Sequence, residues 1–145
     1  MPFTPFHFGP NASIIISLHK YLDVPVFLFV NIIIDCEAFL VIIFGLNYPL
    51  HGYCHTFLIG SFLGILCGLV AYFARNIFQL FMNSLHFPYK PNFYKMISSG
   101  GLGACFHILL NAPLYSDIKP FFSFDFNPIF GIISSSIIYL ICATY

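Results

Sequence analysis

The chain has 145 residues, of which 59% are hydrophobic and only 7% are Asp, Glu, Lys or Arg, and its mean hydropathy is +0.91. These few charges cannot cover the surface of a soluble domain, and a formal net charge of zero excludes the basic patch that nucleic-acid binding requires. Because a spanning helix needs about 20 apolar residues, the chain is predicted to be an all-α, polytopic integral membrane bundle of four to five helices, one of them short or broken. We expect a single membrane-embedded domain over residues 1–145.

The N-terminal part is expected to contain the short helix. Residues 1–10 lack the basic region of a signal peptide, so we expect no cleavage there. Residues 11–21 are too few to span a bilayer comfortably and predict a short or partly inserted helix. The glycosylation sequon at Asn11 is interpreted as a chance match.

Residues 24–46 are long enough to span a membrane but carry polar groups in their middle. Asn31 precedes Asp35 by one helical turn and shares its face. Asp35 and Glu37 would lie about 200° apart on a regular helix, so either only one of them faces a common site or the helix breaks. We favour a break near Cys36, because a break brings both carboxylates to one side.

Three more apolar segments follow, and the helices they predict cover residues 53–73, 96–114 and 129–145. Within the first of them, glycines recur at every fourth position, at Gly60, Gly64 and Gly68. Such a stripe of small residues lets the backbone of a neighbouring helix approach closely. We therefore interpret these glycines as a packing face.

The basic residues set the expected orientation. Arg75, Lys90 and Lys95 all lie between residues 73 and 96. Short cytoplasmic loops are the ones enriched in Lys and Arg. We therefore expect this loop in the cytoplasm and the connection at residues 46–52 on the outer side.

Ionisable side chains recur at helical spacing inside the apolar segments. His51 and His55 are four residues apart, as are His107 and Asn111, so each pair would share one helix face. An ionisable group in hydrocarbon costs several kcal/mol unless it meets a partner, and basic residues are too few here to neutralise the acids. A divalent metal, with zinc as the first choice, is the more economical partner. The predicted ligands are His7, Asp35, His51, His55, His107 and Asn111.

Other reactive residue types are left out of this site. His19 and His86 have no partner at helical spacing. The five cysteines show no CxxC spacing, so we interpret them as small buried thiols and not as a disulfide framework. Cys36, Cys54 and Cys105 lie next to or near the polar clusters, so a thiolate ligand stays open as an alternative to neutral thiols.

Four motifs occur in order along the chain: MPFTPFHFG, IIIDCEAF, HGYCHTF and HILLNAPLYSDIKPFF. This order resembles the small bacterial and archaeal inner-membrane proteins called membrane-bound metal-dependent hydrolases, over residues 1–122. The resemblance implies a multi-pass protein of the inner (cytoplasmic) membrane. It also implies a metal-activated water that attacks a phosphoester, in the manner of zinc-dependent phospholipase C. Carried over residue by residue, the resemblance points to His7, Asp35, Glu37, His51, His55 and His107.

The chain departs from the pattern of this family at two places. Gly52 and Tyr53 follow His51 where the family often has Arg-Gly, and Asn111 stands where the family usually has Asp. The first departure removes a basic group suited to a phosphate, and the second replaces a charged ligand by a neutral one. Asp117, six residues after Asn111, is a candidate for the missing charge.

The expected function is metal-dependent hydrolysis of a lipid-linked or membrane-proximal ester, with a phosphoester as the first candidate. The metal would be held by His51, His55, His107 and Asp35. Glu37 or Asp117 would act as general base. Two alternatives stay open. One is a non-catalytic protein that binds or transports metal or other ions, and the other is a small structural membrane protein with vestigial ligands.

Overall fold

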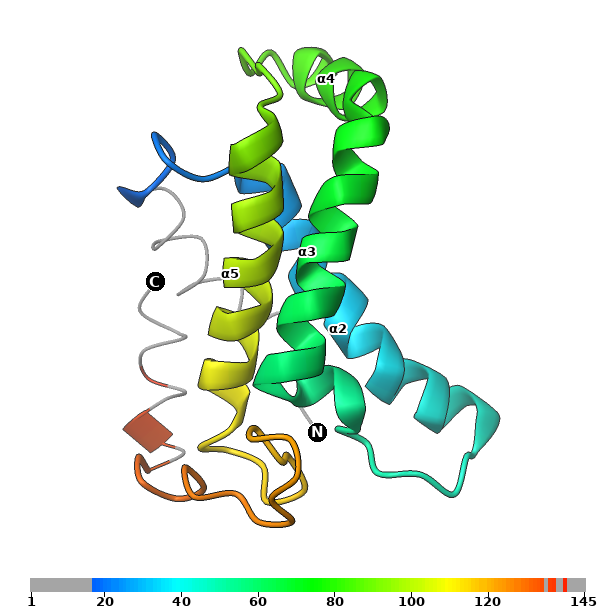
Figure 1. The fold of residues 1–145 in the computed structure, drawn as a ribbon, viewed down its shortest axis with the longest axis vertical. Helices are drawn as coiled ribbons and strands as arrows, with labels where there is room; N and C mark the ends of the chain where they lie inside the picture. The colour runs from blue at the N-terminus through cyan, green and yellow to red at the C-terminus, as the bar shows by residue number, and fades with distance from the viewer. Residues whose placement is uncertain (1–16, 135, 138–139, 141–145) are drawn as a thin grey trace.

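The computed structural model describes residues 17–134, 136, 137 and 140. Within these residues there are four α-helices, one 3-10 turn and no strand, so the all-α class is confirmed. Figure 1 shows α3 and α5 side by side, α2 crossing obliquely behind them, and α4 across one end of the molecule. The elements are α2 (Val24–Phe44), η1 (Tyr53–His55), α3 (Phe57–Phe73), α4 (Arg75–Ser84) and α5 (Phe93–Asn111).

The α2 helix is continuous, and the predicted break near Cys36 is wrong. The helix begins after Asp23, whose carboxylate accepts a hydrogen bond from the backbone N–H of Val26 at 3.1 Å, and it ends at Gly45 in the left-handed conformation. No glycine or proline interrupts it between Val26 and Phe44, so nothing in the backbone favours a break.

The helices predicted at the two ends of the chain are described only in part. Residues 18–22 form turns, and the rest of the predicted short helix lies outside the described residues. Residues 128–133 form turns and bends, so a helix starting at Ile129 is wrong. Residues 136, 137 and 140 are helical. His7 and Asn11 lie outside the described residues.

Backbone contact between glycines holds α3 against α5, as the small-residue stripe predicted. A Cβ atom added at Gly64 would collide with the carbonyl oxygen of Gly100, and one added at Gly100 would collide with the carbonyl oxygen of Gly64. Gly68 packs equally closely on the carbonyl of Met96. Since the two helices run in opposite directions, this contact places the start of α3 beside the end of α5.

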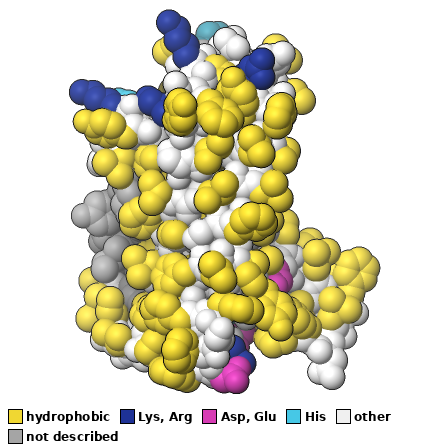
Figure 2. Space-filling model, in the orientation of Figure 1, with side chains coloured by type: hydrophobic (Ala, Val, Ile, Leu, Met, Phe, Trp, Pro, Cys, Tyr) yellow, Lys and Arg dark blue, Asp and Glu magenta, His cyan; other side chains and the backbone are white. Residues whose placement is uncertain are grey.

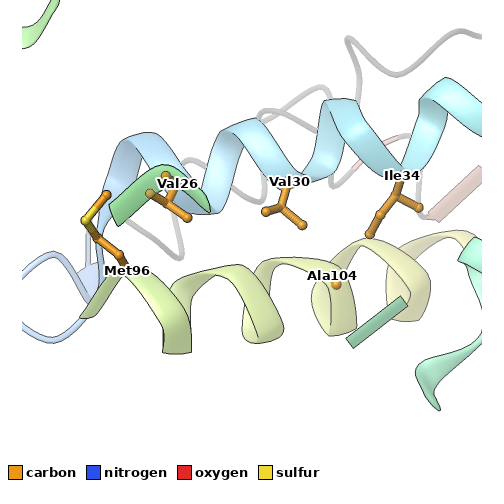
Figure 3. Close-up of a cluster of buried hydrophobic side chains, with 6 residues drawn as sticks. Val26, Val30, Ile34, Met96 and Ala104 are labelled. Atoms are coloured by element: carbon orange, nitrogen blue, oxygen red, sulfur yellow. The ribbon is translucent and has the colours of Figure 1, made fainter. Parts of the chain in front are cut away.

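The seam between α2 and α5 is filled by apolar side chains one turn apart. Val26, Val30 and Ile34 are fully buried on α2, and they pack in one cluster with Met96 and Ala104 of α5. Figure 3 shows the two sets facing each other along the helices. This spacing is the helical repeat expected for a helix that buries one face.

The α4 helix was not predicted, because its residues fall in a segment expected to be a loop. It is bent by 76° from α3. Phe78 of α4 packs against the α2–α5 cluster and meets Phe29 of α2 edge to face, at 6.1 Å between ring centroids. Four of its five polar residues lie within about 100° on one side of the helix, and the fifth, Ser84 at its end, falls between Ile77 and Leu80.

Apolar side chains cover much of the face shown in Figure 2, and each of the four described helices exposes large hydrophobic residues. Among the described helices, α2 alone is long and apolar enough to cross a membrane, and α3 with α4 would count as a second span if the bent pair is taken together. Only 33% of the most apolar window of α2 is buried inside the structure.

The glycine contact gives a test of the fold. Replacing Gly64 by Ala should destabilise the protein by about 1–3 kcal/mol, because the new methyl group pushes α3 away from the backbone of α5. Thermal unfolding in detergent, followed by helical circular dichroism, measures the change. Gly101→Ala is the matched control, since its Cβ would meet the Ile65 side chain at 3.1 Å and would stay 4.0 Å from the backbone oxygen of Ser61. Equal melting temperatures for the two variants would contradict the role of the glycine contact.

Candidate metal site

The candidate site lies where three elements meet at one end of the bundle. Asp35 and Glu37 come from the middle of α2, His55 from η1, and His107 and Asn111 from the last turns of α5. The antiparallel arrangement of α3 and α5 brings η1 beside the end of α5, and α2 crosses both. The rings of His55 and His107 lie 5.5 Å apart, centroid to centroid.

Three of the predicted ligands share a site within the described residues. Asp35 Oδ1 lies 3.1 Å from His107 Nε2 and 3.7 Å from His55 Nε2. One ligand atom from each residue lies within 4.8 Å of the other two. Both histidines are fully buried, and Asp35 is partly buried.

Glu37 orients the imidazole of His55. The Nδ1 atom of His55 lies 3.2 Å from Glu37 Oε2, so Nδ1–H donates to the carboxylate and the lone pair is left on Nε2. Backbone N–H groups of Gly52 and Cys54 also donate to Glu37, at 3.1 and 3.2 Å. A carboxylate that holds a histidine in this way is the usual support of a metal-binding imidazole.

The Nε2 atom of His55 makes no hydrogen bond within the described part of the chain, although it is buried. Leaving a buried polar atom without a partner costs about 1–3 kcal/mol. The missing hydrogen bond of His55 Nε2 therefore indicates that the space between the side chains holds either a metal ion or a proton shared with Asp35. Burial by itself would lower the pKa of His55, but the carboxylates of Asp35 and Glu37 outweigh it and raise that pKa.

Asn31 orients the second histidine. Its Nδ2 atom donates to the carbonyl of Phe27 at 2.7 Å, which leaves Oδ1 to accept from His107 Nδ1–H at 3.2 Å. The lone pair of His107 therefore also lies on Nε2, where Asn111 Nδ2 donates to it at 2.9 Å. Rotating the Asn111 amide by half a turn would present its oxygen in place of this nitrogen.

These distances suit a small divalent cation. Bonds of about 2.0 Å to a tetrahedral zinc put neighbouring ligand atoms about 3.3 Å apart, close to the observed separations of Asp35 from the two histidines. The ligand types are imidazole and carboxylate, which zinc accepts. Three protein ligands would leave one coordination position for water or substrate, and the amide oxygen of Asn111 is a further candidate ligand.

His51 lies beside this group and has a different partner. Its Nδ1 atom is 3.0 Å from Asp117 Oδ2, and its backbone N–H donates to the same oxygen at 3.2 Å. Its ring meets the ring of His55 edge to face, with centroids 4.7 Å apart. Burial lowers the pKa of His51, although Asp117 opposes the effect.

The prediction that His51 and His55 share the face of an α-helix is wrong. His51 lies in a loop, and His55 lies in η1 before α3 begins. The helical pairing of His107 with Asn111 is confirmed. Asp35 and Glu37 both reach His55 from an unbroken helix, which neither sequence alternative foresaw.

Two further predictions concern residues near the site. Glu37 was predicted as a possible base, but its hydrogen bonds give it the role of holding His55 and the η1 backbone. Burial and the neighbouring Glu37 raise the pKa of the Cys54 thiol to about 11, so it is a neutral thiol near pH 7. The supporting role of Asn31 was signalled in the sequence only by its position one turn before Asp35.

Comparison with known proteins identified no relative of this chain. No family model matches the sequence, and no characterised protein or solved structure shows significant similarity to it. The likeness to membrane-bound metal-dependent hydrolases therefore stays a prediction from the four motifs. The site has to be argued from its own geometry.

The geometry predicts which residues retain a metal. The purified protein should bind zinc, and His55→Ala or His107→Ala should weaken binding by at least about tenfold, because each removes a direct ligand. His51→Ala should leave binding within about twofold, since its Nδ1 pairs with Asp117 instead. Metal analysis and competition with a zinc-sensitive dye measure the affinity. His19→Ala is the control for loss of a histidine outside the site.

Zinc binding should also depend on pH in a defined direction. The pKa of His55 is raised above its ordinary value of 6.5, so protons compete with the metal up to a higher pH than for a free histidine. Affinity is therefore full above that raised pKa and falls as the pH drops through it. Equal binding by the wild type and all three site variants, or affinity independent of pH between 5 and 8, would contradict the metal site.

Proposed function

We propose that this protein is an integral membrane, metal-dependent hydrolase of a lipid-linked or membrane-proximal ester, with a phosphoester as the first candidate. The observation that carries the proposal is that a candidate metal-binding group and a His–Asp pair lie side by side. Asp35, His55 and His107 form a group able to hold an ion, and the His51–Asp117 pair lies against it. A zinc ion held by such a group lowers the pKa of a coordinated water toward neutrality.

His51 is the proposed general base, with Asp117 as its positioning residue. Asp117 accepts from Nδ1–H, which orients the ring and leaves Nε2 to take up a proton. The lowered pKa of His51 keeps the imidazole neutral near pH 7. Glu37 is less suited to this role, because its oxygens accept hydrogen bonds from His55 and from the loop backbone.

A pocket of about 360 Å³ gives access to this pair, with His51 and Asp117 in its wall. Lys119 also lines the pocket and is 52% exposed at its side chain, in an ion pair with Asp125 at 2.8 Å. A cation at the mouth suits an anionic ester such as a phosphate. It offers a positive group in the region where the related motif pattern has an arginine.

Apolar surface beside the pocket favours a lipid substrate. Phe122 and Phe124 line both this pocket and a neighbouring apolar groove that follows the outer side of α3 past Phe62 to Ile65. An ester group in the pocket would thus have an adjacent surface for an acyl chain. The exposed apolar residues of α2 and α3 are the surface that a bilayer would cover.

The alternative of an ion pathway through the bundle is less well supported. A pathway needs polar groups at successive depths. Between the candidate site and the opposite end, the α2–α5 seam is closed by Val26, Val30 and Met96, all fully buried. The polar cluster around Asp35 lies beside an open pocket, which fits hydrolysis better.

Separating metal binding from activity tests this function. Zinc-loaded protein in detergent should release product from aryl phosphodiesters or phospholipids, and His51→Ala should lower the rate by about 10²–10⁴-fold while the metal content stays unchanged, as expected for loss of a general base. Asp117→Asn should act in the same direction. Release of product is measured by absorbance or mass spectrometry. An active enzyme whose His51→Ala variant keeps the full rate would overturn the role of His51, and a zinc-loaded wild type inactive on the whole panel would favour the non-catalytic alternative.

Cysteine labelling tests the membrane arrangement. In a Cys-free background, a cysteine at Asn47 should react with a membrane-impermeant reagent in intact cells, and a cysteine at Asn83 should react only after lysis. The reason is that Arg75, Lys90 and Lys95 lie at the Asn83 end, and short cytoplasmic loops are the ones enriched in Lys and Arg, so we expect that end in the cytoplasm. Labelling of the Asn83 position alone in intact cells would reverse the orientation, and labelling of both would argue against a membrane between them.

A further inference from the structure

The α4 helix has an apolar strip that no part of the described chain covers. At about 100° per residue, Ile77, Leu80 and Phe81 fall on one side of the helix. They are 70%, 73% and 60% exposed. Phe78 uses a neighbouring side of the helix to pack on the bundle and leaves the strip exposed.

The other exposed side of α4 is polar. Arg75, Asn76 and Asn83 lie within about 100° of one another on this side and are exposed. Arg75 also stacks over the ring of Tyr72 at 4.9 Å and donates to the Tyr72 carbonyl. A short helix with separate apolar and polar sides is the form that lies in a membrane–water interface.

Charge at this end of the molecule is one-sided. Four of the five Lys and Arg residues, Lys20, Arg75, Lys90 and Lys95, belong to the segments that meet here, and Figure 2 shows Lys and Arg side chains gathered at this end. The acid among them, Asp23, is buried and accepts from the hydroxyl of Tyr89 at 2.7 Å. The exposed charge is therefore positive.

We propose that α4 is an interfacial helix that inserts Ile77, Leu80 and Phe81 into the headgroup region of a leaflet containing anionic lipids. The 76° bend after α3 turns α4 across the end of that helix, which lays it along the membrane plane if α3 crosses the bilayer. In this arrangement the neighbouring basic residues would face lipid phosphates, and Tyr94, 80% exposed in the first turn of α5, would serve as an aromatic anchor. This inference rests on the proposed membrane setting but not on the proposed hydrolysis.

The chain contains no tryptophan, so a single introduced Trp reports on one position. Phe81→Trp places the probe on the apolar strip, and Asn83→Trp places the matched control on the polar side of the same helix. The full chain is reconstituted in phosphatidylcholine vesicles with about a third phosphatidylglycerol, using lipids brominated high on the acyl chain. Co-flotation of the wild type with the vesicles checks the membrane setting separately.

The Phe81→Trp protein should emit at shorter wavelength and be quenched at least about twofold more by brominated lipid than the Asn83→Trp protein. Neutral vesicles, or the combined substitution Arg75→Gln, Lys90→Gln and Lys95→Gln, should reduce this difference. Equal quenching of the two probes overturns the interfacial helix. A blue-shifted Phe81→Trp signal without lipid quenching also overturns it, and indicates a second protein copy on the strip. If either of these results is found while the wild type floats with the vesicles, the proposed membrane setting stands and only the interfacial role of α4 is overturned. If the wild type does not float, the membrane setting and the interfacial helix are both overturned.

Discussion

The close backbone contact between α3 and α5 is the constraint on which the other features of this structure depend. Gly64 and Gly100 have no room for a Cβ atom between them, so the two helices pack at a fixed register. That register puts His55, two residues before α3, beside His107 near the end of α5. The two imidazoles come from different elements, η1 and α5, and this register brings both of them to Asp35.

The polar side chains around Asp35 hold one another in place through hydrogen bonds. Asn31 and Glu37 fix the two histidines so that both turn Nε2 toward Asp35, and the loop before η1 is itself held by its N–H bonds to Glu37. Buried charges of this kind are stable only when paired, and removing one partner exposes the rest to the full desolvation cost. The burial of these charged and polar groups has a free-energy cost, but it also brings together the ligand atoms that could hold a small cation or protons. Function and stability are therefore coupled through Asp35.

The two ends of the bundle differ in charge and in chemistry. One end holds carboxylates, imidazoles and the pocket beside His51, and the other holds most of the basic residues and the amphipathic α4. A buried apolar seam along α2 and α5 separates them. In the proposed membrane setting, such a division would let the basic end set the orientation while the candidate site lies at the other end.

The sequence by itself determined the all-α class, the packing role of the glycines and the pairing of His107 with Asn111, because these depend on composition or on spacing within one helix. Tertiary structure decided the rest. It showed that α2 does not break, that Glu37 supports His55, and that His51 pairs with Asp117, sixty-six residues away. Helical periodicity relates only residues on one element, so it could not reveal contacts made where the η1 turn, α2 and α5 converge. The physical reason for those contacts is the register of two glycine-packed helices, which no spacing along the chain records.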